Sequence, residues 1–338
     1  MSFRSRVSNR IEEGDCPAWA GLPGFPPAGY ISVKTQEGSV WLHGLAVVTA
    51  GATFLLIIAG ALVVGNEAGL SVPDWPLSYG TWMPPMEGGI FYEHGHRMVA
   101  TFAGLLTTVL AAGLWWKEPR RWVRRVGLAA LLAVLVQGLL GGITVLYLLP
   151  TPVSVGHACL AQIFFCLTLS LALFTSPGWG SPTEPLRDDR VPAFRHLAAA
   201  TTVAVFLQLL LGAALRHKAL GLTPHLVGAG VVSFFVGWLV VRVRTSFESR
   251  NALRRLGWAI GALLVVQLGL GIASYFIRVA TQGAVQPQIS VVLITTAHVA
   301  AGALLLGGVW SLTLLVYRAD EAASKAPSFA NSPQKTWA

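Results

Sequence analysis

The chain has 338 residues, of which 54% are hydrophobic and only 12% are charged. A soluble domain carries about 25% charged residues, so this composition excludes an ordinary soluble globular protein. The net charge of +9 would by itself suggest nucleic-acid binding, but the basic residues lie in short segments between apolar runs, which excludes that class. We therefore predict a polytopic membrane protein in contact with the lipid bilayer.

The chain begins with a polar segment, residues 1–40, that is rich in proline and glycine. It contains no apolar stretch of the kind found in a secretory signal peptide. Acidic residues at Glu12, Glu13 and Asp15 follow its first arginines and argue against a transit peptide. We expect a cytoplasmic N-terminal tail.

Apolar segments of membrane-spanning length follow this tail. About 20 apolar residues cross the hydrocarbon core as a helix, and uninterrupted apolar runs favour helices over a β-barrel, whose strands alternate. The predicted fold class is an all-α polytopic membrane protein with eight transmembrane helices. The predicted spans are 41–65, 97–116, 126–149, 156–174, 196–215, 225–241, 256–277 and 291–317.

Lysine and arginine are concentrated in alternate connections. The connections 117–125, 175–195 and 242–255 are basic, whereas 66–92 and 279–290 contain neither lysine nor arginine. Cytoplasmic loops carry an excess of basic residues, so this pattern predicts that both termini are cytoplasmic.

The spans also show an internal repeat. The pattern Gln-x-x-x-Gly occurs late in three spans that each precede a histidine-bearing span, at Gln137/Gly141, Gln208/Gly212 and Gln267/Gly271. We predict two tandem, pseudo-symmetric four-helix bundles related by an axis along the membrane normal. Their ranges are 41–174 and 196–317, joined by a cytoplasmic linker at 175–195 and followed by a cytoplasmic tail at 318–338.

Four histidines lie at the starts of four different spans, at His96, His157, His225 and His298. Ionisable groups are costly inside a membrane and usually functional. Two histidines in each predicted half can supply the two axial ligands of a heme iron, and bundle cores are common sites for such cofactors. The remaining histidines, His43, His94, His196 and His217, share no common placement, and we assign them no role.

The two halves differ beside their first histidine. Glu93 lies three residues before His96, on the same helix face, whereas Leu222 holds the matching position before His225. The acid predicts proton-coupled chemistry in the N-terminal half, the alternative being that Glu93 caps a helix start. Arg97 suits a heme propionate, Glu93 or a lipid headgroup.

The connection 66–92 is long for a membrane protein. Long ordered loops are often functional lids, so we expect a rigid cap over the N-terminal site. Anchoring of Trp75, Tyr79 and Trp82 in the interfacial belt is the alternative. The cysteines, Cys16, Cys159 and Cys166, predict no disulfide framework.

These residues resemble the heme A synthase family. The resemblance rests on the segment Gly69-Leu70-Ser71-Val72-Pro73-Asp74-Trp75-Pro76, on Glu93-x-x-His96-Arg97, and on His157, His225 and His298. It covers roughly residues 41–317. The chain departs from some members in having no cysteine pair in the first outer loop, which puts in doubt any step that needs that pair.

The resemblance implies an activity and its cofactors. The family oxidises the C8 methyl group of heme O to a formyl group by two successive hydroxylations, giving heme A for terminal oxidases. By resemblance, His96 and His157 face the substrate heme, His225 and His298 bind a heme b, and Glu93 is the essential acid. A bacterial plasma membrane location is implied, and a heme O synthase partner is expected from the order of the pathway. The electron acceptor is not named by the sequence, and a homo-oligomer is left open.

Two other functions use the same histidines. A di-heme electron carrier or quinone oxidoreductase of the membrane needs both pairs but has no use for an acid beside only one of them. A non-catalytic heme-handling or transport protein would exchange heme without modifying it.

Overall fold

The computed structural model describes residues 40–181, 183, 186, 190–246 and 250–325. Cys16, nearly all of the predicted N-terminal tail and residues 326–338 of the predicted C-terminal tail lie outside this range. The described residues form helices and loops with no strand, apart from an isolated bridge between Ser78 and Thr81.

Eight long helices account for most of the described chain, and each is long and apolar enough to cross a membrane. The predicted all-α polytopic membrane fold is therefore confirmed. The helices are α1 (Val40–Gly65), α2 (Gly88–Lys117), α3 (Arg121–Leu146), α4 (Thr151–Thr175), α5 (Phe194–Arg216), α6 (Leu222–Ser246), α7 (Asn251–Ala280) and α8 (Ile289–Lys325), with a short 3₁₀ turn at Pro177–Trp179.

Most helices extend beyond the predicted spans. The largest difference is at α2, which begins at Gly88 rather than near residue 97. Gly88 has a left-handed φ of 52° and follows the pair Pro84-Pro85, so the chain turns sharply into the helix there. Glu93 and His96 therefore lie inside α2, one to two turns from its start, and the preceding loop is shortened to 66–87. At the other terminus, α8 continues to Lys325, past the predicted span end at residue 317.

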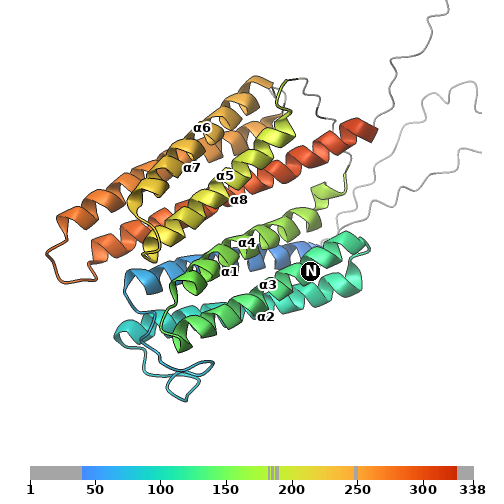
Figure 1. Cartoon of the computed structure of the whole chain (residues 1–338). Helices are drawn as coiled ribbons and strands as arrows, with labels where there is room; N and C mark the ends of the chain where they lie inside the picture. The colour runs from blue at the N-terminus through green and yellow to red at the C-terminus, as the bar shows by residue number, and fades with distance from the viewer. Residues whose placement is uncertain (1–39, 182, 184–185, 187–189, 247–249, 326–338) are drawn as a thin grey trace, which may run out of the picture. The chain divides into compact units, whose positions relative to one another are not determined.

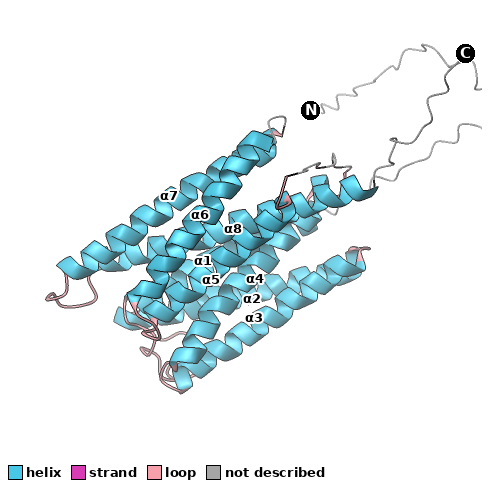
Figure 2. Cartoon of the chain, turned by 45° about the horizontal axis from the view of Figure 1, so that its top comes forward, coloured by secondary structure: helices cyan, strands magenta, loops and turns pink. Residues whose placement is uncertain are grey.

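The helices pack as two rings of four (Figures 1 and 2). In the first ring α1 contacts α2 and α4, and α3 contacts α2 and α4; in the second, α5 to α8 contact one another in the same order. Helices α1, α4, α5 and α8 make the contacts between the rings. The order of contacts agrees with the predicted halves, whose origin as a tandem repeat stays a prediction.

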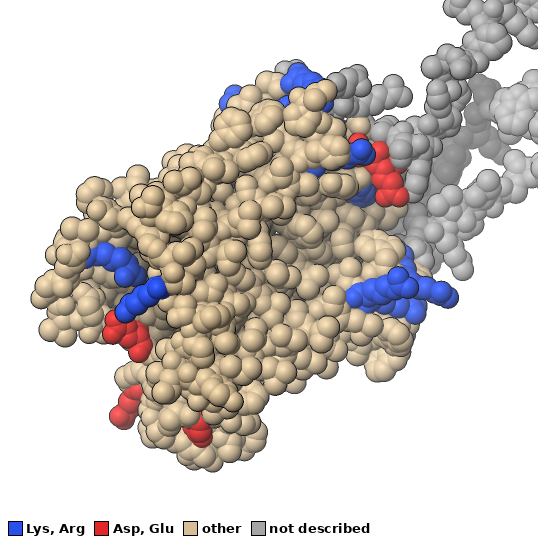
Figure 3. Space-filling model, in the orientation of Figure 1, with Lys and Arg blue, Asp and Glu red and all other residues tan. Residues whose placement is uncertain are grey.

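The two ends of the bundle differ in charge (Figure 3). One end carries the α1–α2, α3–α4, α5–α6 and α7–α8 connections, and we call it the loop end (left in Figure 1). The opposite end carries most of the lysines and arginines, and we call it the basic end. The arrangement follows from the sequence pattern of alternate basic connections.

A tight contact between the rings yields a stability prediction. A Cβ added to Gly307 on α8 would stand 2.7 Å from Leu169 Cδ1 and 3.1 Å from Phe165 Cε1, both on α4. Gly307→Leu should therefore lower the free energy of unfolding by about 1–3 kcal/mol through overpacking, measured in detergent by thermal or chemical unfolding.

The matched control is Gly104→Leu on α2, since a Cβ at Gly104 would meet open space. Both substitutions gain similar helix propensity, so the difference between them reports the contact. Equal stability of the two variants would refute the packing described for α4 and α8.

Candidate functional site

The second ring brings His225 and His298 close together, in an edge-to-face arrangement. Their ring centroids lie 6.3 Å apart, with an angle of 74° between the planes. A metal ion held between two imidazoles by bonds of about 2 Å each would set the ring centres roughly 6 Å apart. The observed separation fits two axial ligands of one iron.

The first ring carries His96 on α2 and His157 on α4, each packed against a glycine of the preceding helix. The Nδ1 atoms of both rings are buried without a hydrogen-bond partner among the described residues. Buried polar atoms are normally paired, so unpartnered imidazole nitrogens are consistent with a site for a ligand. The four predicted histidines thus form two pairs, one in each ring.

Each of these histidines packs on a glycine of the preceding helix. An added Cβ would stand 3.1–3.4 Å from the Cε1 atom of the neighbouring imidazole in all four cases. Small residues allow such close approach between helices. The pairs are Gly60 with His96, Gly141 with His157, Gly212 with His225, and Gly271 with His298.

Glutamines one turn before these glycines contact three of the four histidines. Gln137 donates its side-chain amide to the backbone carbonyl of His157 at 3.0 Å. Gln208 donates to the carbonyl of His225 at 2.9 Å and lies 3.1 Å from its Nδ1. Gln267 lies 3.3 Å from Nε2 of His298. The Gln-x-x-x-Gly pattern therefore marks the surface on which each histidine rests.

The fourth histidine lacks this support. Leu56 holds the position one turn before Gly60, so no amide is available beneath His96 from α1. Metal-ligating histidines are usually fixed by hydrogen bonds to their other nitrogen or their surroundings. His96 is therefore the one of the four histidines without a glutamine of this pattern beside it.

The His, Cys, Asp and Glu side chains described around the pairs do not form a conventional metal-ion site. Among the described residues there is no group of three or more His, Cys, Asp or Glu side chains able to hold a metal ion. A porphyrin supplies four nitrogens of its own and needs only two protein ligands, so paired histidines fit an iron porphyrin better than a bare cation. Cys159 and Cys166 are both free thiols on α4.

Glu93 is buried beside the first pair, with 4% of its surface exposed. Its two carboxylate oxygens accept hydrogen bonds from the backbone N–H of Val72, at 2.8 Å, and from the Arg97 guanidinium, at 2.7 Å. The first turn of α2 contains no acidic residue and Glu87 is the N-cap. Glu93 therefore does not cap the helix, which was the alternative to a chemical role.

Arg97 binds the α1–α2 loop as well as Glu93. Its guanidinium donates to the carbonyls of Val72, Asp74 and Leu77 at 2.8–3.2 Å. Three predicted partners were open for Arg97, and these contacts favour the Glu93 pair over a lipid headgroup. The ion pair could be predicted from the sequence, since Glu93 and Arg97 are four residues apart on one helix. The hydrogen bonds of Arg97 to the loop carbonyls could not.

The loop itself packs into the first ring. Val72 is fully buried, and an added Cβ on Gly142 of α3 would stand 2.7 Å from the Trp75 ring. His94 is also tied to the loop, through a 2.8 Å hydrogen bond between its Nδ1 and Ser78 Oγ. Trp82 and Tyr79 are exposed at the surface. The loop is therefore both seated on the ring and equipped for an interfacial belt, so its two predicted roles are compatible.

Asp74 organises the outer part of the loop. Its carboxylate accepts hydrogen bonds from the backbone N–H groups of Gly80, at 2.8 Å, and Tyr79, at 2.7 Å. These bonds, with Gly80 first, hold the pKa of Asp74 below its ordinary value of 3.8. The Asp74 carboxylate is therefore charged at neutral pH.

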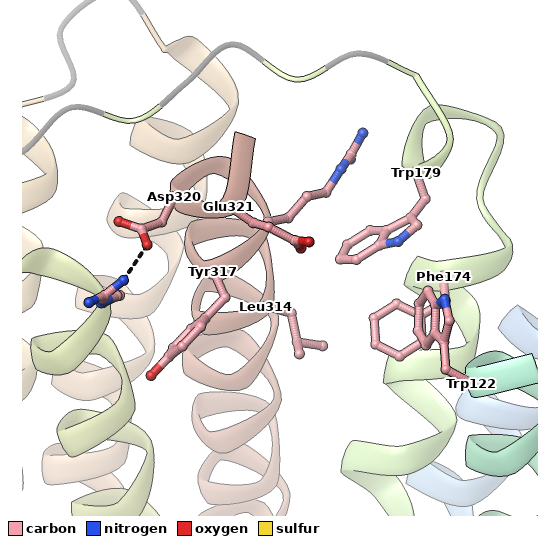
Figure 4. Close-up of a pocket in the computed structure, with 9 residues that line it drawn as sticks. Trp122, Phe174, Trp179, Leu314, Tyr317, Asp320 and Glu321 are labelled. Carbon is pink, nitrogen blue, oxygen red and sulfur yellow. Dashed lines mark hydrogen bonds and ion pairs between the residues drawn. The ribbon is translucent and has the colours of Figure 1, made fainter. Parts of the chain in front are cut away.

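A hollow on the described bundle lies at the basic end, away from both histidine pairs (Figure 4). It has a volume of about 640 Å³. Arg195 pairs with Asp320 at its edge, and Arg318 stacks on Trp179. Aromatic and arginine side chains are typical of a membrane interface, and the hollow contains none of the predicted site residues.

Comparison with known proteins shows which proteins this chain resembles. The model of a family described as cytochrome oxidase assembly protein matches residues 88–224, which include Glu93, His96 and His157. A heme A synthase of Symbiobacterium thermophilum is 27% identical over 234 residues, covering 67% of this chain and 74% of the relative. The chain is a relative of the heme A synthases.

Further relatives agree with this assignment. A heme A synthase of Bacillus pumilus is 25% identical over 269 residues, covering 71% of this chain and 87% of the relative. One of Roseobacter denitrificans is 34% identical over 152 residues, but the match spans only 40% of this chain and 38% of that relative. The resemblance to the heme A synthase family that the motifs predicted is thereby confirmed.

The Glu93–Arg97 contact generates a test of the loop. In Glu93→Gln the Arg97 guanidinium loses its charged partner and the Val72 N–H loses a carboxylate acceptor, each a charge-assisted bond of about 1.5–3 kcal/mol. Amide hydrogen exchange across residues 66–87 should therefore accelerate by about tenfold or more.

Glu67→Gln is the control, because Glu67 is an exposed acid of the same loop. Equal amide hydrogen-exchange rates across residues 66–87 in Glu93→Gln and Glu67→Gln would show that Glu93 does not hold the loop.

Proposed function

We propose that this chain is a heme A synthase, which oxidises the C8 methyl group of heme O to a formyl group. The observation that carries the proposal is the acid at only one histidine pair: Glu93 stands beside His96, whereas Leu222 stands at the matching place before His225. The names of its relatives support the same activity. An electron carrier would need both pairs but not the acid.

We further propose a division of labour between the rings. His96 and His157 would bind the iron of the substrate heme O, and residues 41–174 would form the substrate half. His225 and His298 would bind a heme b in the half 196–317, and that cofactor supplies electron transfer when bound. The 6.3 Å separation of the second pair supports the axial role of its members.

Glu93 would act on the charge that develops at the methyl carbon as it is oxidised. Both of its oxygens already accept a hydrogen bond. These two bonds fix the orientation of the carboxylate, so it would not readily turn to accept a proton. This favours electrostatic stabilisation over service as a base. The loop held by Arg97 would cover the site and exclude water, which strengthens such interactions.

The setting of the reaction follows from the charge pattern. The basic end would face the cytoplasm, with both termini on that side, and the loop end would face outward. The location would be the bacterial plasma membrane, in keeping with the bacterial relatives. Water would supply the formyl oxygen, a membrane electron acceptor would take the electrons removed from the methyl group, and the protons would be released to solvent. A heme O synthase would supply the substrate.

The acid gives the first test of function. Glu93→Gln keeps the size of the side chain but removes its charge, so formyl formation should fall by about 100-fold or more while heme b stays bound. The measurement is the pyridine hemochrome spectrum after incubation with heme O. Normal heme A formation by this variant would defeat the role of the acid, and unmodified heme O with the unaltered protein would favour an electron carrier or a heme transporter.

The second ring gives another test. His225→Ala and His298→Ala should each lose the resident heme, and Gly271→Leu should lose it too, because a side chain there meets the His298 ring at 3.1 Å. Heme content per chain is measured from the Soret band of the purified protein.

Gly269→Leu, two residues away on the same helix, meets open space and should retain the heme. Full occupancy in both histidine variants would overturn the assignment of the second ring.

A further inference from the structure

A groove runs between α5 and α6 on the outer surface of the second ring, and we call it the α5–α6 groove. Its volume is about 480 Å³. Apolar side chains from both helices line it, among them Val203, Leu207, Leu211, Val231 and Phe235. Val203, Leu207 and Val231 are each about half exposed, so in a membrane the groove faces lipid. Its surface suits a hydrocarbon chain.

One polar residue interrupts this apolar lining. Of the described residues that line the groove, Gln208 alone has a polar side chain. Its amide nitrogen donates to the backbone carbonyl of His225 at 2.9 Å and lies 3.1 Å from Nδ1 of the same residue. A single side chain therefore connects the groove to one of the two histidines of the second pair.

The amide oxygen of Gln208 has no hydrogen-bond partner among the described residues, although it is buried. It lies against Gly228, another lining residue, where an added Cβ would stand 2.1 Å from it. A buried acceptor without a donor is costly and uncommon. This end of the groove therefore suits a ligand that brings an O–H donor of its own.

The depth of Gln208 limits the class of ligand. The residue lies eight positions before the end of α5 at Arg216, which is about 12 Å along the helix. Because a span of this length crosses the hydrocarbon core, the amide lies well below the membrane surface. A phospholipid keeps its charged headgroup at that surface, whereas a neutral polar ring can enter the core.

We propose that the α5–α6 groove binds a membrane quinone, which is the electron acceptor of this protein, an inference that rests on the proposed function. The quinone ring lies at Gln208, and its isoprenoid chain follows the apolar side chains of α5 and α6. In the reduced ligand a hydroxyl group donates to the unpartnered oxygen of Gln208. The acceptor is thereby placed one side chain away from His225.

The chemistry of a quinone balances the proposed reaction. Conversion of the methyl group to a formyl group consumes one water and releases four electrons and four protons. Each quinone takes up two electrons and two protons and becomes a quinol. Two quinones are therefore reduced for each formyl group formed, and no other oxidant is required.

The test measures oxidation of the iron in the second ring. In a His96→Ala/His157→Ala background, the bound heme is reduced with dithionite and mixed with a quinone that carries a short isoprenoid chain. Reoxidation is followed at the Soret band. In Val203→Trp/Val231→Trp, whose added rings occupy the groove, the rate at subsaturating quinone should fall by about tenfold or more, in proportion to the lost affinity.

Val227→Trp/Val241→Trp is the matched control. Both valines lie on α6 and are more than half exposed, and neither lines the groove. This variant should keep the quinone rate of the background protein. Ferricyanide, a water-soluble oxidant that has no use for an apolar groove, should reoxidise the heme at the same rate in all three proteins.

Equal quinone rates in the groove variant and its control would overturn the binding site. Reoxidation of the background protein by ferricyanide but by no quinone would overturn the choice of acceptor and leave the proposed function standing. A background protein that bound no heme would instead defeat the proposed function, and this inference with it.

Discussion

The close contact of an imidazole with a glycine backbone is the constraint on which this structure depends. Four times, a histidine ring lies against a glycine of the preceding helix, at a distance that leaves little room for a side chain. The contact fixes the spacing of each helix pair. The order of the helices in each ring then places two histidines in that ring. We propose that this packing provides a site for a flat, iron-bearing ligand.

The surroundings of the two pairs then determine what each can do. The second pair has a glutamine beside both histidines, which under the proposed function suits retention of a cofactor. The first pair has a leucine beneath His96, a buried carboxylate and a loop packed over the ring, which suits a ligand that enters, reacts and leaves. Under the proposed function, these differences at matched positions would separate a cofactor site from a substrate site.

Much of the fold could be predicted from the sequence, because long apolar runs and alternate basic connections are strong signals that depend on composition alone. The start of α2 was predicted nine residues late, since Gly88 to His96 contains polar residues that are buried by the loop rather than by lipid. The histidines and Glu93 could be found from their spacing. The contacts of Arg97 with the loop carbonyls and of Trp75 with Gly142 could not, because they join segments far apart along the chain.

The central claim is that both histidine pairs bind iron porphyrins and that one ring oxidises the porphyrin that it binds. The most direct measurement is extraction and mass analysis of the hemes from protein purified from cells that make heme O. We predict about one unmodified heme b per chain together with a formyl-bearing heme derived from heme O. A colourless protein with no Soret band, even when supplied with iron porphyrin, would contradict this account.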